Sequence, residues 1–288
     1  MSLRSFARFA TCVTLAAGLL SSTLTAATNA FFAMDNIARG GPGVAPAMLR
    51  ELGYDGFGGR ALDEIMPPAI AAAGLKFFNG YHVITLDPAQ PAPNEKLRQW
   101  FAAMRGRDTV LWLAVQKVAR GNGTFFPPSS AEADRFVVGE VRAIAEAAAA
   151  AGLRVALYPH TGFWLEGVED ALRIADQVNR PDVGVTFNLC HWLKVEGDRD
   201  PRPVLKEALP RLFFVTLNGA EAGDTRKMDW NKLIQPLDAG TYDVAGLMKT
   251  LRDLGYAGPI GFQGYGIPGD SREILRCTMN GWLRINAP

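Results

Sequence analysis

The sequence has 288 residues, of which 48% are hydrophobic and 20% charged, and a formal net charge of +1. This composition is ordinary for a globular protein, and the length allows one large domain or two small ones. A charge balance so close to neutral gives no electrostatic reason to expect nucleic acid or an acidic membrane as a partner.

The first thirty residues have the pattern of a targeting segment. Arg4 and Arg8 precede an apolar stretch over residues 9–24, which is followed by the small and polar TAATNA. We predict a secretory signal peptide over residues 1–30, cleaved near Ala27 or Ala30, and a secreted or periplasmic mature protein. The alternative is an uncleaved membrane anchor, but Thr and Ser interrupt a stretch that is shorter than the ~20 apolar residues a span needs.

Strand and helix signals alternate along residues 31–288, and no linker divides them. Strands are expected at 31–38, 54–59, 75–87, 109–117, 154–160, 183–192, 212–221 and 259–266. Helices are expected at 45–53, 61–74, 94–106, 131–151, 167–179, 203–210, 244–255 and 271–285. Eight such units predict a single (β/α)₈ TIM barrel. An open doubly wound sheet is the alternative, but MDNIARGGPG after the first strand is not the glycine-rich phosphate turn it would need.

The carboxyl ends of barrel strands converge at one face, where active sites form. All three histidines, His82, His160 and His191, follow strand-like runs. The other strand-end residues are mostly amides and hydroxyls, and they include Asn79, Lys117, Tyr158, Asn188, Thr216, Asn218 and Gln263, with Trp192 close by. Amides beside aromatic rings suit a sugar, so we expect a small-molecule carbohydrate as the ligand.

The stretch from RVALYPH (154–160) to IGFQGYG (260–266) resembles the sugar phosphate isomerase/epimerase superfamily, whose members have xylose-isomerase-like barrels. In that family the fifth strand ends in a Glu-Asn-His-like run. The sixth carries Asp-x-x-His, the seventh His-x-x-Asp and the eighth a Glu. The resemblance implies a sugar substrate and one divalent metal, held by the two Glu, the Asp and the seventh-strand His.

The chain departs from the family pattern at each of the four metal-binding positions. In chain order, these positions hold Tyr158, Asn188, Thr216 and Gln263. None of these side chains supplies the anionic oxygen that hard divalent ions prefer. His160 and His191, in contrast, match histidines of the family. We therefore expect a site without a metal or another cofactor.

Two functions remain open. The first is a secreted enzyme that isomerises, epimerises or eliminates on a sugar, with His160, His191 and Tyr158 as catalytic groups. The second is a catalytically silent barrel, such as a partner subunit, that binds carbohydrate in an inherited pocket. The expected substrate-binding residues are Asn188, Gln263, Thr216, Asn218, Lys117, Asn79, His82 and Trp192.

For these residues a purely structural role is the alternative to a role in the site. A histidine can be a buried core residue, a lysine can be solvated on a loop, and Asn218 can belong to a turn. Cys190 reads as a small core residue, with a catalytic thiol as the alternative. Cys190 and Cys277 lie too far apart in the sequence to suggest a disulfide framework. The oligomeric state stays open.

Overall fold

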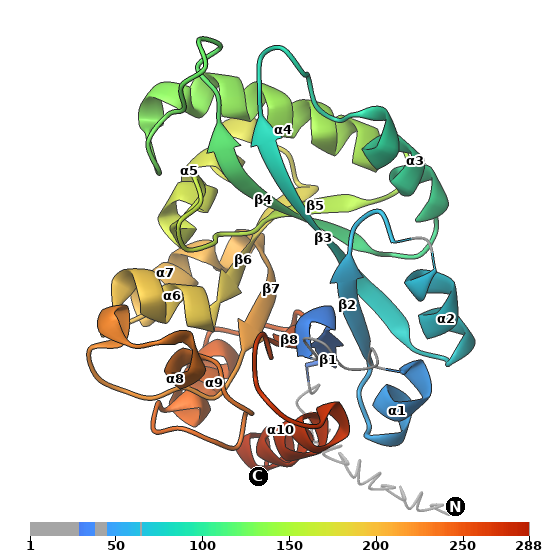
Figure 1. Cartoon of the computed structure of the whole chain (residues 1–288), viewed down its shortest axis with the longest axis vertical. Helices are drawn as coiled ribbons and strands as arrows, with labels where there is room; N and C mark the ends of the chain where they lie inside the picture. Colours follow the sequence, from blue (N-terminus) through green and yellow to red (C-terminus); the bar gives the residue numbers. More distant parts are fainter. Residues whose placement is uncertain (1–28, 38–44, 64, 288) are drawn as a thin grey trace, which may run out of the picture.

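The structure is a computed structural model that describes residues 29–37, 45–63 and 65–287. Eight parallel strands close into a barrel in sequence order, which confirms the predicted TIM barrel (Figure 1). The strands are β1 (Phe31–Met34), β2 (Gly56–Arg60), β3 (Lys76–Leu86), β4 (Val110–Val118), β5 (Arg154–Leu157), β6 (Val183–Asn188), β7 (Leu212–Leu217) and β8 (Ile260–Phe262). Most of the predicted signal peptide lies outside the described residues.

Helices cover the outer surface of the barrel. They are α1 (Pro46–Glu51), α2 (Met66–Ala72), α3 (Glu95–Ala103), α4 (Asp134–Ala149), α5 (Val168–Val178), α6 (Leu189–Glu196), α7 (Arg202–Ala208), α8 (Trp230–Leu233), α9 (Val244–Asp253) and α10 (Ser271–Ile285). Asn94 caps α3, because its side chain accepts a hydrogen bond from the backbone N–H of Leu97. No helix in the described ranges is long and apolar enough to cross a membrane.

The strands are apolar on both faces because one face meets the helices and the other fills the barrel. Aromatic rings occupy much of the barrel interior. Phe32 stacks on Phe78 with ring centroids 4.7 Å apart, and Trp112 meets Phe214 edge to face at 5.2 Å. This packing ends towards the carboxyl face at Tyr158, which stacks on Trp112.

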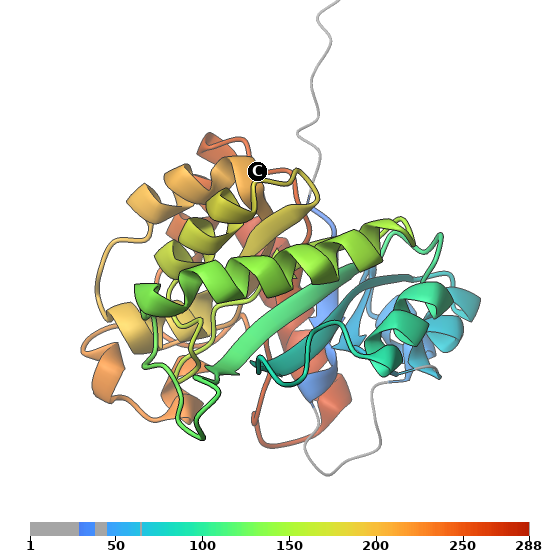
Figure 2. The ribbon, with the colours of Figure 1, turned by 90° about the horizontal axis from the view of Figure 1, so that it is seen from above.

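β3 and β4 continue past the rim of the barrel. β4 pairs with β5 only over residues 110–113, whereas its pairing with β3 runs on to Val118. Figure 2 shows this long pair of strands beside α4. The segment after β5 uses the extension as a support, since the N–H groups of Trp164 and Leu165 donate to Gln116 and Val115.

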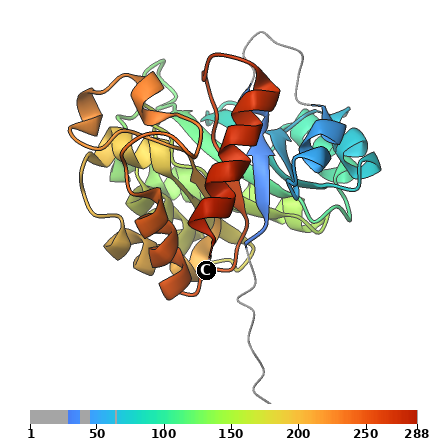
Figure 3. The same ribbon diagram turned by 90° about the horizontal axis from the view of Figure 1, so that it is seen from below.

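α10 closes the barrel at the seam between β1 and β8. Figure 3 shows this helix lying alongside β1. The rings of Phe31 and Trp282 stack with centroids 4.2 Å apart. The Asn29 side chain donates to the carbonyls of Tyr256 and Gly258, which fixes the start of β1 next to β8.

Two of the three histidines do not end a strand as the sequence predicted. His82 lies inside β3, which runs on to Leu86, because the extension keeps it paired with Leu113 of β4. β6 ends at Asn188, and His191 lies in the first turn of α6. The apolar run hides this boundary, because a buried strand and a buried helical turn have the same composition.

Candidate active site

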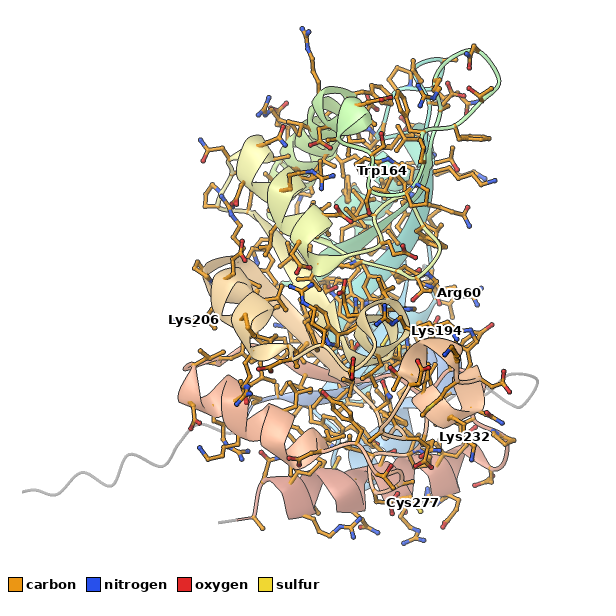
Figure 4. All side chains as sticks on the ribbon, turned by 90° about the vertical axis from the view of Figure 1, so that its left-hand side faces the viewer. Arg60, Trp164, Lys194, Lys206, Lys232 and Cys277 are labelled. Carbon is orange, nitrogen blue, oxygen red and sulfur yellow. The ribbon has the colours of Figure 1, made fainter. Side chains whose placement is uncertain are left out.

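A cavity of about 440 Å³ opens at the carboxyl ends of the strands. This is the face on which TIM-barrel enzymes carry their active sites, and the volume is within the range of ligand pockets. Four of the predicted site residues line it, namely Tyr158, His160, His191 and Gln263. In Figure 4 the labelled Arg60, which also lines the cavity, lies on the side of the molecule opposite Lys206 of α7.

The two imidazoles of the cavity are in direct contact. The ring centroids of His160 and His191 lie 4.1 Å apart. His160 also stacks on Phe163 at 4.0 Å. The turn that carries His160 passes through Gly162, which adopts a φ of +77° that favours glycine, and the His160 N–H donates to the Leu165 carbonyl.

Thr161 contacts both imidazoles. His160 Nδ1 lies 2.9 Å from the Thr161 carbonyl oxygen. A carbonyl only accepts, so Nδ1 carries the proton and Nε2 of His160 keeps its lone pair. The Thr161 hydroxyl lies 3.2 Å from Nδ1 of His191.

Both imidazoles are held in their neutral form. Burial lowers the pKa of His160, although its hydrogen bond to Thr161 and the charge of Glu166 oppose this. Burial also lowers the pKa of His191 well below the ordinary value, and the neighbouring His160 lowers it further. A neutral imidazole offers one donor and one acceptor, which is the state a general base needs before it takes a proton.

Tyr158 forms the floor of the cavity. It is 1% exposed, stacks on Trp112 at 5.3 Å and meets the edge of Tyr81 at 5.0 Å. Burial raises the pKa of Tyr158 well above the ordinary value, and a hydrogen bond with Gln263 opposes the increase. Tyr158 therefore keeps its proton and acts as a hydrogen-bonding group.

Asn188 and Thr216 lie in the interior, next to the cavity rather than on its wall. Thr216 is fully buried and donates to Oδ1 of Asn188 over 3.1 Å. The Asn188 amide nitrogen donates to the Pro159 carbonyl and to Thr186 Oγ1. These bonds fix the chain below the imidazoles, since Pro159 directly precedes His160.

Three other predicted binding residues lie away from the cavity. Asn218 is fully buried and donates to the carbonyls of Gly219 and Leu233. The Trp192 indole donates to the Arg199 carbonyl on the outer side of α6. Lys117 is exposed on the β4 extension, where its ammonium lies 4.9 Å from the Phe125 ring.

A register shift in β3 accounts for the position of Asn79 and His82. Phe57 and Gly58 of β2 pair with Phe77 and Asn79, so one extra residue is accommodated between them. Tyr81 then faces the cavity, and the next residue, His82, points to the opposite face of the strand. Asn79 is fully buried against Gly58, and neither of its amide atoms has a partner within the described residues.

The cavity also holds residues that the sequence prediction did not select. Asp35 follows β1, and its carboxylate lies 3.4 Å from Arg60 Nε at the end of β2. Trp230 begins α8 and meets His191 edge to face at 5.9 Å. Asp35 and Tyr81 could be found as strand-end residues, whereas Arg60 and Trp230, which comes from the segment between β7 and β8, gave no such signal.

The sequence comparison matches residues 87–281 to a family described as xylose isomerase-like TIM barrel. The chain belongs to this family. A search of curated proteins finds no match. The family includes enzymes that act on sugars, and its fold agrees with the closed barrel described above.

Several solved structures are similar to this xylose isomerase-like barrel. A zinc-bound IOLI protein has a TM-score of 0.71 at 12% identity, covering 90% of this chain and 98% of the other. D-allulose 3-epimerase from Methylomonas sp. has a TM-score of 0.68 at 16% identity, with 89% and 98% covered. A fusion of such a barrel with 4-hydroxyphenylpyruvate dioxygenase has a TM-score of 0.66 at 16% identity. This match covers 90% of the present chain but only 43% of the fusion protein. At these identities the likeness shows the fold.

Proposed function

We propose that this xylose isomerase-like barrel is an enzyme that moves a proton at a carbon next to the carbonyl of a sugar, without a metal. The observation that carries the proposal is the pair of touching, neutral imidazoles of His160 and His191 in the cavity wall. Two adjacent groups that differ in the position of their proton can supply both a base and a hydrogen-bond donor.

The hydrogen bonds suggest a role for each imidazole. His160 Nε2 has its lone pair available, so it takes the proton from carbon. If the Thr161 hydroxyl donates to His191 Nδ1, then Nε2 of His191 carries a hydrogen. This N–H stabilises the negative charge that develops on the carbonyl oxygen.

The residues at the family's metal-binding positions do not suit a divalent ion. Asn188 and Thr216 are hydrogen-bonded to each other, and the Asn188 amide also donates to Pro159 and Thr186. Tyr158 is packed between aromatic rings and keeps its proton. Donors already used in internal hydrogen bonds cannot replace the carboxylates of a metal site.

The second candidate function is a silent barrel that binds a carbohydrate. The same internal hydrogen bond between Asn188 and Thr216 supports it, because a site that has lost the family's ligands can still bind through Gln263 and Trp230. The indole of Trp230 is 38% exposed, which leaves area for a sugar ring to stack.

We also propose that the protein is secreted or periplasmic. The basic and apolar pattern of residues 1–24 supports this location, and the ordered contacts of Asn29 support cleavage before that residue. Mass determination of the protein isolated from its natural source would test the cleavage, and fractionation of the source cells would test the location. A mature chain that still contains Arg4 and Arg8 would contradict the cleavage, and recovery in the cytoplasmic fraction would contradict the location.

Proton exchange tests the choice between enzyme and silent barrel. The mature protein, treated with EDTA, is incubated in deuterated water with a panel of D-allulose, D-fructose and a 3-keto-glucoside, and NMR follows the C–H signals. The enzyme exchanges a C–H for C–D next to the carbonyl, and with at least one sugar of the panel His160→Gln slows the exchange by about 10²-fold or more. His82→Gln is the matched control, since His82 faces away from the cavity.

The possible outcomes separate the proposals. If calorimetry detects binding of a sugar but NMR detects no exchange of C–H for C–D, the silent barrel is favoured. Exchange that disappears after EDTA treatment and returns with Mn²⁺, Mg²⁺ or Zn²⁺ would contradict the metal-free mechanism.

A further inference from the structure

We propose that Asp35 is a second proton-transferring group, which works from the wall opposite His160 and makes the reaction an inversion at carbon, that is, an epimerisation. This inference rests on the proposed function and assigns its reaction type. Each step below uses the topology and the cavity geometry.

The barrel topology places Asp35 and His160 on opposite walls. The strands follow one another in sequence order around a closed barrel, so three strands separate β1 from β5 in either direction. Asp35 directly follows β1, and His160 lies three residues after β5. Both side chains line the same cavity. A ligand between them meets one group on each of its two faces.

Asp35 is the one carboxyl group among the described residues that line the cavity. Its side chain is 29% exposed, and Arg60 Nε lies 3.4 Å from Oδ2. The Arg60 side chain is 82% exposed, so it orients the carboxyl group from the solvent side of the cavity. A positioned carboxyl at a strand end is suited to acid–base chemistry.

The charges around Asp35 favour a group that can carry a proton. The pKa of Asp35 is raised, mainly by burial and further by the nearby Asp63, although Arg60 and a hydrogen bond from the backbone oppose the increase. Tyr81 also faces Asp35, and its own pKa is raised first by burial and then by the charge of Asp35. The other ionisable residues of the cavity wall are Tyr158, Tyr265, His160 and His191. Burial lowers the pKa of both histidines, so neither adds a positive charge that would favour the ionised form of Asp35.

The reaction balances without an oxidant or reductant. His160 Nε2 takes the proton from carbon on its face, the C–H electron pair forms a C=C bond, and the carbonyl π electrons move onto oxygen. The protonated Asp35 then donates its proton to the opposite face of the same carbon, and the carbonyl re-forms. The product has the inverted configuration, His160 is protonated and Asp35 is ionised, and solvent restores both groups.

The test separates inversion from exchange. Asp35→Asn and the wild type are incubated in deuterated water with each sugar of the panel above. We expect Asp35→Asn to keep His160-dependent C–H exchange with retained configuration, and to lose formation of the epimer by about 10²-fold or more. With the opposite epimer as substrate, we expect His160→Gln to keep exchange and Asp35→Asn to lose it.

Asp63→Asn is the matched control, because Asp63 acts on Asp35 only through its charge, and Asn retains the oxygen that accepts from Ile65 and Met66. Formate added to Asp35→Ala should restore inversion, which a purely structural role would not allow. Inversion at the wild-type rate in Asp35→Asn, or equal loss of inversion and exchange from both epimers, would overturn the assignment while the proposed function stands. Absence of exchange in the wild type with the whole panel would reject both.

Discussion

His160 and His191 lie with their ring centroids 4.1 Å apart, and Thr161 is hydrogen-bonded to Nδ1 of each ring. The contact to His160 uses the Thr161 carbonyl, and the contact to His191 uses its hydroxyl. One residue thus orients two imidazoles that come from different elements, the loop after β5 and the first turn of α6. The hydroxyl is the part of this arrangement that a substitution can remove alone.

Thr161→Val should reduce proton exchange at carbon by about 10-fold to 10²-fold. Valine keeps the shape of the side chain and the backbone carbonyl, so His160 keeps its hydrogen bond while His191 loses one. The ¹⁵N chemical shifts of the His191 ring should change towards a mixture of tautomers, whereas those of His160 should stay. Thr161→Ser, which restores the hydroxyl, should recover both the rate and the spectrum. Unchanged His191 shifts in Thr161→Val would show that the hydroxyl has no such role.

The stability of the protein should fall as the pH drops below about 6.5. The folded pKa values of His160 and His191 lie below the ordinary value of 6.5, so the unfolded chain binds these protons first. Above pH 6.5 these histidines are neutral in both states and do not reduce the free energy of unfolding. It decreases below that value with a slope approaching about 1.4 kcal/mol per pH unit for each histidine that stays neutral.

Urea unfolding at pH 7.5 and pH 5.5 measures this decrease. The double variant His160→Gln/His191→Gln should lose less stability between the two pH values than the wild type does. His82→Gln provides a comparison, because His82 lies outside the cavity and burial lowers its pKa as well. An equal decrease in the wild type and the double variant would show that the pair does not cause the pH dependence.

Gly58→Ala should destabilise the protein by roughly 1–3 kcal/mol. A Cβ atom at this position would lie 2.2 Å from Asn79 Oδ1 and 2.8 Å from a ring carbon of Phe32. Both neighbours are buried, so neither has room to move. Gly139→Ala is the matched control, since a Cβ there meets nothing within 4 Å on the exposed side of α4. It should stabilise by about 1 kcal/mol, because alanine has the higher helix propensity. Thermal and urea unfolding would measure both changes.

The sequence was sufficient for the fold because the apolar runs and the helical patterns alternate eight times. It was less informative about where strands end. His191 was expected at the end of a strand, yet it lies in a helix, because the buried run continues unchanged through Asn188. His82 was expected at a strand end, but pairing with β4 continues beyond it.

The candidate site was predictable where its wall is formed by residues at or just after the end of a strand. Tyr158 and Gln263 directly follow β5 and β8, and His160 and His191 lie three residues beyond the ends of β5 and β6. Trp230 does not, because it comes from the segment between β7 and β8 and reaches the cavity only through tertiary contacts. Conversely, Asn188 and Thr216 follow the pattern, but their hydrogen bonds to each other and to the chain could not be deduced from sequence.

Trp230→Ala should weaken sugar binding about 10-fold while the fold remains intact. The indole is 38% exposed at the cavity wall, so its removal costs stacking area and little core packing. Lys194→Met should weaken binding too, because the Lys194 ammonium donates to the carbonyls of Arg226 and Met228 just before Trp230. Calorimetric titration with D-allulose measures both, with Lys232→Met as a control for lost charge. Unchanged affinity in Trp230→Ala would place the sugar elsewhere.

Asn188→Asp, which restores one acidic residue of the family pattern, should destabilise the protein by roughly 1–3 kcal/mol and should not create a metal site. Asn188 is 2% exposed, and its amide nitrogen donates to the Pro159 carbonyl. A carboxylate in the same place would set an anionic oxygen against that carbonyl in a buried environment. Urea unfolding measures the loss, and metal analysis after dialysis against Mn²⁺ measures binding. Asn188→Ser serves as the uncharged control, since it removes the amide without adding a charge. A variant that binds one Mn²⁺ per chain and regains wild-type stability with it would show that the neighbouring residues still support the family's metal.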